Sequence, residues 1–145
     1  MFERIMIATD GSKHSERAAE VGIELARLSG GAITIIYVAD TGRLSHLPED
    51  MAIASIRSLL IREGEDATNY VEEKATRAGV ASTKMVVEGN PGDELLRLSS
   101  ESGIDVVVMG SVGRTGLDKF LLGSVAENVV RNSRVPVLTV PGEKI

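Results

Sequence analysis

IDVVVMGSVGRTGLDKFLLGSVAENVV, residues Ile104–Val130, contains an apolar run, a loop with several glycines and an amphipathic helix that opens at Gly123 and Ser124. A short apolar run bounded by glycine on both sides, Ile104–Met109, predicts a strand buried on both faces of a parallel sheet. Because glycine has no Cβ, a ligand can approach the main chain closely, and such a loop can wrap around a phosphate. The loop glycines are Gly110, Gly113, Gly116 and Gly123.

The start of the following helix predicts an anion site. Its first N–H groups, near Gly123, Ser124 and Val125, have no partners within the helix and lie at the positive end of the helix dipole. Ser124 is expected either to cap these donors or to give its hydroxyl to a phosphate oxygen. The alternative is that the glycines only form a turn and Ser124 only caps the helix. These residues alone leave both interpretations open.

The whole chain alternates strands and helices, which predicts one domain, residues 1–145, with a parallel doubly wound α/β sheet and right-handed crossovers. Pro136 cannot donate to a sheet ladder, so the last strand is expected to be the outermost. The expected strands are Arg4–Thr9, Ile33–Ala39, Lys84–Val87, Ile104–Met109 and Val135–Val140, and the expected helices are Ser12–Ser29, Met51–Ala78, Pro91–Ser100 and the helix from Gly123.

The first two helices carry apolar side chains at helical spacing. Gly64 lies inside the second helix and indicates either a bend or a break, so the pattern leaves open whether Met51–Ala78 is one helix or two. The expected buried side chains are Ala18, Val21, Leu25 and Leu28 in the first helix and Ile53, Ile56, Leu60, Ala67, Tyr70, Val71 and Ala75 in the second.

Composition and charge exclude several classes of protein. The 145 residues can bury roughly two-thirds of their unfolded surface, and the absence of cysteine excludes a disulfide framework and a thiolate metal site. No apolar stretch approaches the ~20 residues of a membrane span, and the amino terminus has no signal-peptide architecture, so we expect a cytoplasmic protein without a membrane partner. A net charge of −5 and 3% aromatic residues predict no nucleic-acid partner.

Three segments resemble the ATP-binding branch of the universal stress protein family. Gly110, two residues, Gly113, nine residues and then Gly123-Ser124 resemble its nucleotide-binding signature. RIMIATDGS at 4–12 resembles its opening strand and loop, and SRVPVLTV at 133–140 resembles its closing strand. The resemblance implies a Rossmann-like five-stranded sheet of order 3-2-1-4-5, in which the loops after strands one and four face each other where the winding reverses.

The resemblance also implies a set of ATP contacts at this crevice. Asp10 is expected at the nucleoside, and the main-chain amide and carbonyl of Val38 are expected to face the adenine edge. The residues alone leave Asp10 open between this role and one at the start of the first helix. The side chain of Val38 also suits the core, and Met109 suits the core better than the wall of a ligand site. The expected ATP-binding residues are Ala8, Thr9, Asp10, Val38, Met109, Gly110, Gly113, Gly123, Ser124 and Val125.

No catalytic group is expected. The sequence has neither G-x-x-x-x-G-K-[ST] nor a G-x-G-x-x-G after the first strand, and no nucleophile with a base and an orienting group. Arg114 and Lys119 suit screening of phosphate charge and Asp118 suits indirect binding of a cation, and each equally suits a solvated loop.

Our hypothesis is an ATP-binding stress-response or signalling module with Mg²⁺ or Mn²⁺ on the phosphates and at most slow hydrolysis. One alternative is a dimeric interaction protein that binds AMP, a cyclic nucleotide or no nucleotide. Another is a true hydrolase or nucleotidyl-transferring enzyme on the same fold.

The closing strand predicts self-association. VPVLTV, Val135–Val140, has no charged residue, and an apolar edge strand without charge is a pairing site. The resemblance implies antiparallel pairing of this strand across a two-fold axis. We therefore expect a homodimer, together with a protein partner that the sequence does not identify.

Overall fold

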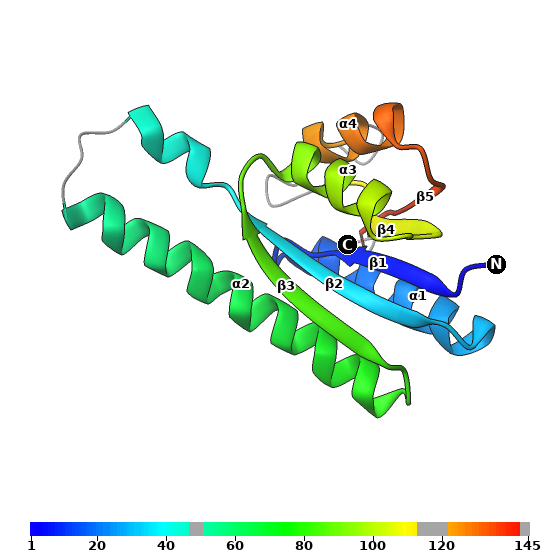
Figure 1. Cartoon of the computed structure of the whole chain (residues 1–145). Helices are drawn as coiled ribbons and strands as arrows, with labels where there is room; N and C mark the ends of the chain where they lie inside the picture. Colours follow the sequence, from blue (N-terminus) through cyan, green and yellow to red (C-terminus); the bar gives the residue numbers. More distant parts are fainter. Residues whose placement is uncertain (47–50, 113–121, 143–145) are drawn as a thin grey trace.

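The computed structural model describes residues 1–46, 51–112 and 122–142, and in them one five-stranded sheet (Figure 1). All neighbouring strands are parallel and their order is β3-β2-β1-β4-β5, which confirms the predicted fold class and strand order. The elements in chain order are β1 (Arg4–Ala8), α1 (Lys13–Ser29), β2 (Ala32–Ala39), the 3-10 helix η1 (Thr41–His46), α2 (Met51–Arg77), β3 (Ser82–Glu88), α3 (Pro91–Glu101), β4 (Val106–Gly110), α4 (Ser124–Asn132) and β5 (Val137–Val140).

Helices cover both faces of the sheet. Helices α1 and α2 pack on one face, and α3 and α4 pack on the other (Figure 1). Right-handed crossovers explain this division, because the chain moves from β1 to β3 in one direction and then returns to add β4 and β5 on the other side of β1. Since β1 and β4 are neighbours at the reversal point, the loops after these strands leave on opposite faces.

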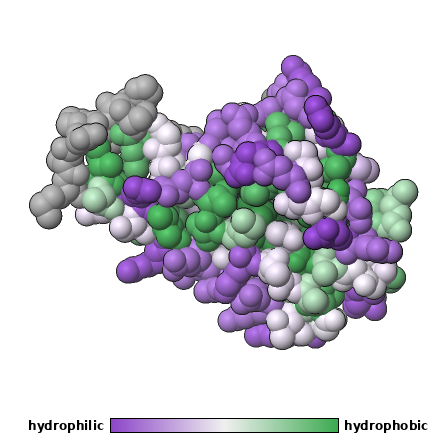
Figure 2. All heavy atoms as spheres, in the orientation of Figure 1, coloured by the Kyte–Doolittle hydropathy of each residue, from purple (hydrophilic) through white to green (hydrophobic). Residues whose placement is uncertain are grey.

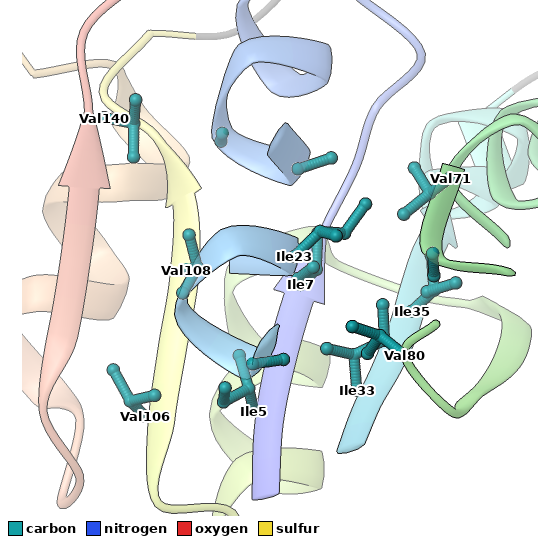
Figure 3. Packing of buried hydrophobic residues seen from close by; sticks show 14 residues of the cluster. Ile5, Ile7, Ile23, Ile33, Ile35, Val71, Val80, Val106, Val108 and Val140 are labelled. Atoms are coloured by element: carbon teal, nitrogen blue, oxygen red, sulfur yellow. The ribbon is translucent and has the colours of Figure 1, made fainter. Parts of the chain in front are cut away.

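The core between α1 and the sheet joins branched strand side chains to small helix residues. Figure 3 shows Ile5, Ile7 and Val108 gathered around Ile23 of α1. A β-carbon on Gly22 would lie 2.7 Å from the side chain of Ile7, so the glycine allows the helix backbone to approach the strand. The buried positions of α1 are Ser15, Ala18, Ala19, Gly22, Ile23 and Ala26.

The predicted stripe of α1 is therefore right only at Ala18. Val21 and Leu25 are partly buried at the margin of the core, and Leu28 is 70% exposed. The prediction favoured large apolar side chains, whereas a helix that lies close to a sheet buries its small residues. The prediction, which was based on side-chain size, therefore placed the buried face of α1 wrongly by part of a helical turn.

Helix α2 is one continuous helix from Met51 to Arg77, so Gly64 does not divide it into two helices. A β-carbon on Gly64 would lie 2.6 Å from Cδ1 of Tyr37 and 2.9 Å from Cγ1 of Val86, which shows that the helix crosses the sheet at this glycine. Thr68, one turn further, is also buried, and its hydroxyl donates to the carbonyl oxygen of Gly64 at 2.9 Å. That hydrogen bond satisfies the hydroxyl within the helix and permits its burial.

The predicted stripe of α2 is correct at Val71 and Ala75, which are fully buried, and wrong at Ile56 and Tyr70, which are exposed. The prediction considered only apolar residues and therefore did not include Gly64 and Thr68. Contact with the sheet selects Gly64 because it leaves room for Tyr37, and Thr68 is buried one turn further along the helix.

The strand β4 begins later than the apolar run predicted. Asp105 interrupts that run, and its carboxylate accepts the main-chain N–H groups of Glu3 and Arg4, each at 2.9 Å. The aspartate thereby ties the start of β1 to the start of β4. Within the described ranges, none of the helices is both long enough and apolar enough to cross a membrane.

Candidate functional site

The end of β2 directs main-chain groups toward the end of β1. The carbonyl oxygen of Ile36 accepts the N–H of Thr9 at 2.9 Å, whereas the carbonyl oxygen of Ala39 accepts the N–H of Gly89 beyond β3 at 3.0 Å. Since main-chain groups alternate along a strand, the N–H and C=O of Val38 face the same side as those of Ile36. They point past Ala8, where β1 ends. This is the direction that the prediction for Val38 requires.

The turn after β1 is held by a small hydrogen-bond network. The hydroxyl of Thr9 is buried, pairs with the hydroxyl of Ser15 at 3.1 Å and accepts the N–H of Gly11 at 3.2 Å. Asp10 accepts the N–H of Ser12 on Oδ1 at 2.9 Å. Ser12 itself is the N-cap of α1, with its hydroxyl accepting the N–H of Ser15. Asp10 therefore does not cap the helix, and its carboxylate is fixed at the carboxyl end of β1.

The end of β4 lies against the start of α1. A β-carbon on Gly110 would lie 3.1 Å from the carbonyl oxygen of Val112 and 3.4 Å from that of His14. The two loops at the reversal point are thus close enough to form two sides of one crevice. Gly110 keeps this end of β4 free of a side chain.

The start of α4 returns to the end of β4. The N–H of Ser111 donates to the carbonyl oxygen of Val140 at 3.0 Å, and the N–H of Gly123 donates to the carbonyl oxygen of Ser111 at 2.7 Å. Gly123 is the N-cap of α4, with φ −64° and ψ 161°, and no side chain among residues 1–46, 51–112 and 122–142 caps the helix. The donors at the start of α4 are therefore available to an anion.

The structure excludes the capping role considered for Ser124. This residue is the first of the helix, not its cap, and it is exposed. By contrast, Ser12 caps α1 and Asn90 caps α3 with their side chains. The contact of its hydroxyl with a phosphate oxygen stays a prediction.

The other predicted residues divide into core and periphery. The side chains of Ala8 and Met109 are 9% and 5% exposed and belong to the core on the α3–α4 face, as the core interpretation of Met109 expected. The side chains of Val38 and Val125 are partly buried at the margin of the same core. The predicted positions outside the described residues are Gly113, Arg114, Gly116, Asp118 and Lys119.

An acidic cleft of about 420 Å³ lies on the other face, between α1 and α2. Three carboxylates in its wall repel phosphate, so it does not suit the phosphates of a nucleotide. The sequence analysis missed this cleft, although the i, i+3 and i+7 spacing of Glu63, Asp66 and Tyr70 places all three on one side of a helix. Its lining is Thr9, Gly11, Glu16, Glu63, Asp66, Ala67 and Tyr70.

Two basic residues, Lys13 and His14, open α1. Lys13 is exposed, but His14 is half-buried and its ring packs against Gly142. Its Nδ1 is buried without a hydrogen-bond partner among the residues that the structure describes. In that same part of the chain, no three His, Asp or Glu side chains are grouped as ligands for a metal ion.

These features define a doubly wound α/β protein with a candidate anion site where its winding reverses. The sequence matches the universal stress protein family over residues 1–141, and the chain belongs to that family.

Relatives and solved structures agree with this assignment. Universal stress protein MJ0531 of Methanocaldococcus jannaschii is 37% identical over 144 residues, which cover 99% of this chain and 85% of that protein. The solved structure of MJ0577 from the same organism has a TM-score of 0.87 at 27% identity, covering 100% of this chain and 99% of that one. A universal stress protein solved in complex with cAMP has a TM-score of 0.70 at 28% identity, with 97% of each chain covered.

Proposed function

We propose that this protein binds ATP and acts as a nucleotide-dependent switch in stress response or signalling. The observation that carries the proposal is the start of α4, which lies beside the end of β4 and which no side chain of the described part of the chain caps. A phosphate there receives main-chain N–H donors and the positive end of a helix dipole, an interaction of about 0.3–1 kcal/mol per charge at an exposed site. The residues proposed to hold the triphosphate are Gly110, Gly113, Gly123 and Ser124.

The nucleoside is proposed to lie at the ends of β1 and β2. Support comes from the main-chain groups of Val38, which point past the end of β1, and from Asp10, whose carboxylate is fixed at that end. Ala8, Thr9, Met109 and Val125 complete the proposed contacts. Mg²⁺ or Mn²⁺ would neutralise phosphate oxygens and would take most of its ligands from them and from water, as Mg²⁺ commonly does.

The switch acts through the segment between Gly110 and Gly123. Phosphate contacts at both glycines fix the two ends of this segment, so the presence of the nucleotide changes the surface offered to a protein partner. At most slow hydrolysis resets this state. The residues of the proposed site that the structure describes supply donors for phosphate but no evident base for attack by water.

A cyclic nucleotide or AMP is the second candidate ligand. The universal stress protein in complex with cAMP, at 28% identity to this chain, favours it. A ligand with one phosphate makes fewer contacts at the start of α4 than a triphosphate does. The order of affinities among adenine nucleotides therefore separates the two candidates.

We also propose a homodimer through Val135–Val140. Strand β5 is the outermost strand on its side of the sheet, and its Leu138 is 39% exposed. Val130 of α4, 44% exposed, adds apolar surface on the neighbouring helix. Pairing of two such strands would bury both and satisfy their outer main-chain groups.

The test is to denature the freshly purified protein and identify any released nucleotide by chromatography. The emptied protein is then titrated by calorimetry with ATP, ADP, AMP and cAMP, with and without Mg²⁺. We expect ATP with Mg²⁺ to bind most tightly. Tighter binding of cAMP or AMP supports the second candidate, and absence of binding by every adenine nucleotide rejects both.

A further inference from the structure

Helix η1 and the first half of α2 project beyond the carboxyl ends of β2 and β3 (Figure 1). Little apolar packing holds this projection, because Ile56 and Leu59 are 39% and 56% exposed. Among residues 53–77 of α2, the first buried position is Gly64. Figure 2 shows hydrophobic atoms on the surface of this part of the molecule, next to the grey residues. Polar contacts must therefore contribute much of what fixes its direction.

One carboxylate joins the projection to the sheet. Glu88, the last residue of β3, accepts Nε of Arg57 on Oε1 at 2.6 Å and Nη2 of Arg57 on Oε2 at 2.7 Å. Helix η1 (Thr41–His46) packs against α2. A guanidinium that binds a carboxylate through two parallel hydrogen bonds fixes orientation as well as distance. Glu88 thus connects the end of β3 to the first part of α2, against which η1 packs.

This connection lies beside the proposed nucleoside end of the crevice. Glu88 is the β3 partner of Ala39, the residue that follows Val38. Helix η1 begins at Thr41, three residues after Val38, so its direction sets the path of the chain that leaves β2. The start of α4 is attached instead to the end of β4, two strands away from β2.

We infer that Glu88 is a positioning residue for the nucleoside: through Arg57 it holds the start of α2, and with it η1 and the chain after β2, so that the main-chain groups of Val38 face the ligand. The inference rests on the proposed nucleotide site and deepens it. Loss of the carboxylate lets η1 and the start of α2 move and weakens the nucleoside contacts. The phosphate contacts at α4 stay as they are.

The pair Arg27–Glu24 provides the matched control. It is a similarly exposed arginine–glutamate pair with two hydrogen bonds, but both residues lie within α1. Exposed pairs of this kind contribute little stability by themselves. The Arg57–Glu88 pair spans 31 positions and joins separate elements. Loss of this pair, but not of the Arg27–Glu24 pair, should therefore change ligand affinity at the site.

The first experiment compares Glu88→Gln with Glu24→Gln for binding of adenosine and of inorganic tripolyphosphate with Mg²⁺. We expect Glu88→Gln to lower the affinity for adenosine about fivefold, a modest factor because the pair is exposed. The affinity for tripolyphosphate should stay within about twofold of that of the wild type. Glu24→Gln should change neither. The exchanged pair Arg57→Glu with Glu88→Arg should restore adenosine binding, which simple damage to the fold would not permit.

The second experiment follows amide hydrogen exchange in the nucleotide-free proteins. Glu88→Gln should speed exchange in residues 41–46 and 51–60, and Glu24→Gln should not. Unchanged exchange in Glu88→Gln overturns the inference. So does faster exchange with unchanged adenosine affinity. If the wild type binds neither adenosine nor any adenine nucleotide, the proposed function fails and the nucleoside role fails with it, while exchange still shows whether Glu88 holds η1 and α2.

Discussion

The N–H of Gly123 donates to the carbonyl oxygen of Ser111 at 2.7 Å, so the helix α4 begins beside the last residues of β4. At this point α4 has a glycine at its cap position, whereas α1 and α3 have Ser12 and Asn90. A glycine cap leaves the place of a capping oxygen to a ligand. That place can be filled by substitution, which allows binding and helix stability to be separated.

Gly123→Asp should abolish most ATP binding without weakening the fold. The main chain at 123 is extended, as a capping residue requires, and aspartate is a favoured N-cap. Its carboxylate takes the helix donors and repels phosphate, so we expect ATP affinity to fall at least about tenfold. The thermal midpoint should stay equal or rise. Calorimetric titration and thermal unfolding measure the two effects.

Gly123→Asn is the control for this substitution. Asparagine caps the same donors without a charge, so its loss of affinity should be smaller than that of aspartate. ATP binding by Gly123→Asp as tight as that of the wild type would show that the phosphates lie elsewhere.

Gly64→Ala should destabilise the protein even though alanine is the better helix former. A β-carbon at 64 would lie 2.6 Å from Cδ1 of Tyr37, and overpacking of this kind typically costs about 1–3 kcal/mol. The gain in helix propensity offsets about 1 kcal/mol. We expect the free energy of unfolding, measured in urea, to fall by up to about 2 kcal/mol.

The exposed neighbour Glu65 provides the control, because Glu65→Ala changes the same helix without touching the sheet. The free energy of unfolding of Glu65→Ala should lie within about 0.5 kcal/mol of that of the wild type. A Gly64→Ala protein as stable as Glu65→Ala would mean that α2 does not press against Tyr37.

Leu138→Lys should convert the proposed dimer to a monomer. Leu138 is exposed on β5, and a lysine in the middle of an edge strand opposes strand pairing. Met85→Lys is the matched control, since Met85 is 41% exposed on β3, the strand at the opposite edge. Light scattering after size-exclusion chromatography gives the mass of each protein. A wild-type monomer at micromolar concentration rejects the proposed dimer, and loss of the dimer in Met85→Lys alone moves the interface to β3.

The strands were predictable because buried parallel strands are short, apolar and separated by helices of regular length. Their order was implied only by the resemblance to the universal stress protein family. The buried faces of the helices were less predictable. Gly22 and Gly64 are buried because of what lies across from them, Ile7 and Tyr37, and the sequence near each glycine carries no sign of that partner. Contacts between distant segments decide such positions.

The residues of the candidate site also differ in how far the sequence predicts them. The positions of Asp10 and Gly123 at strand and helix ends follow from local patterns, which sequence analysis detects. The Arg57–Glu88 pair joins residues 31 positions apart, and only the strand register brings Glu88 beside Ala39. No motif marks such a pair, so it appears only in the folded chain.

The Arg57–Glu88 pair should make stability depend on pH in one direction. The hydrogen bonds and charge of Arg57 hold the pKa of the Glu88 carboxyl below its ordinary value of 4.5. A carboxyl whose pKa is lowered by folding stabilises the folded state above the ordinary value, and this contribution is lost as the pH falls through the lowered pKa.

Urea midpoints of the wild type and of Glu88→Gln should therefore differ at pH 7 and converge as the pH is lowered from about 4.5 toward the lowered pKa. Because both side chains reach solvent, the difference at pH 7 should also shrink in 1 M salt, where the screening length is only about 3 Å. A difference that persisted unchanged to the lowest pH would assign the effect of Glu88→Gln to altered packing and not to the ion pair.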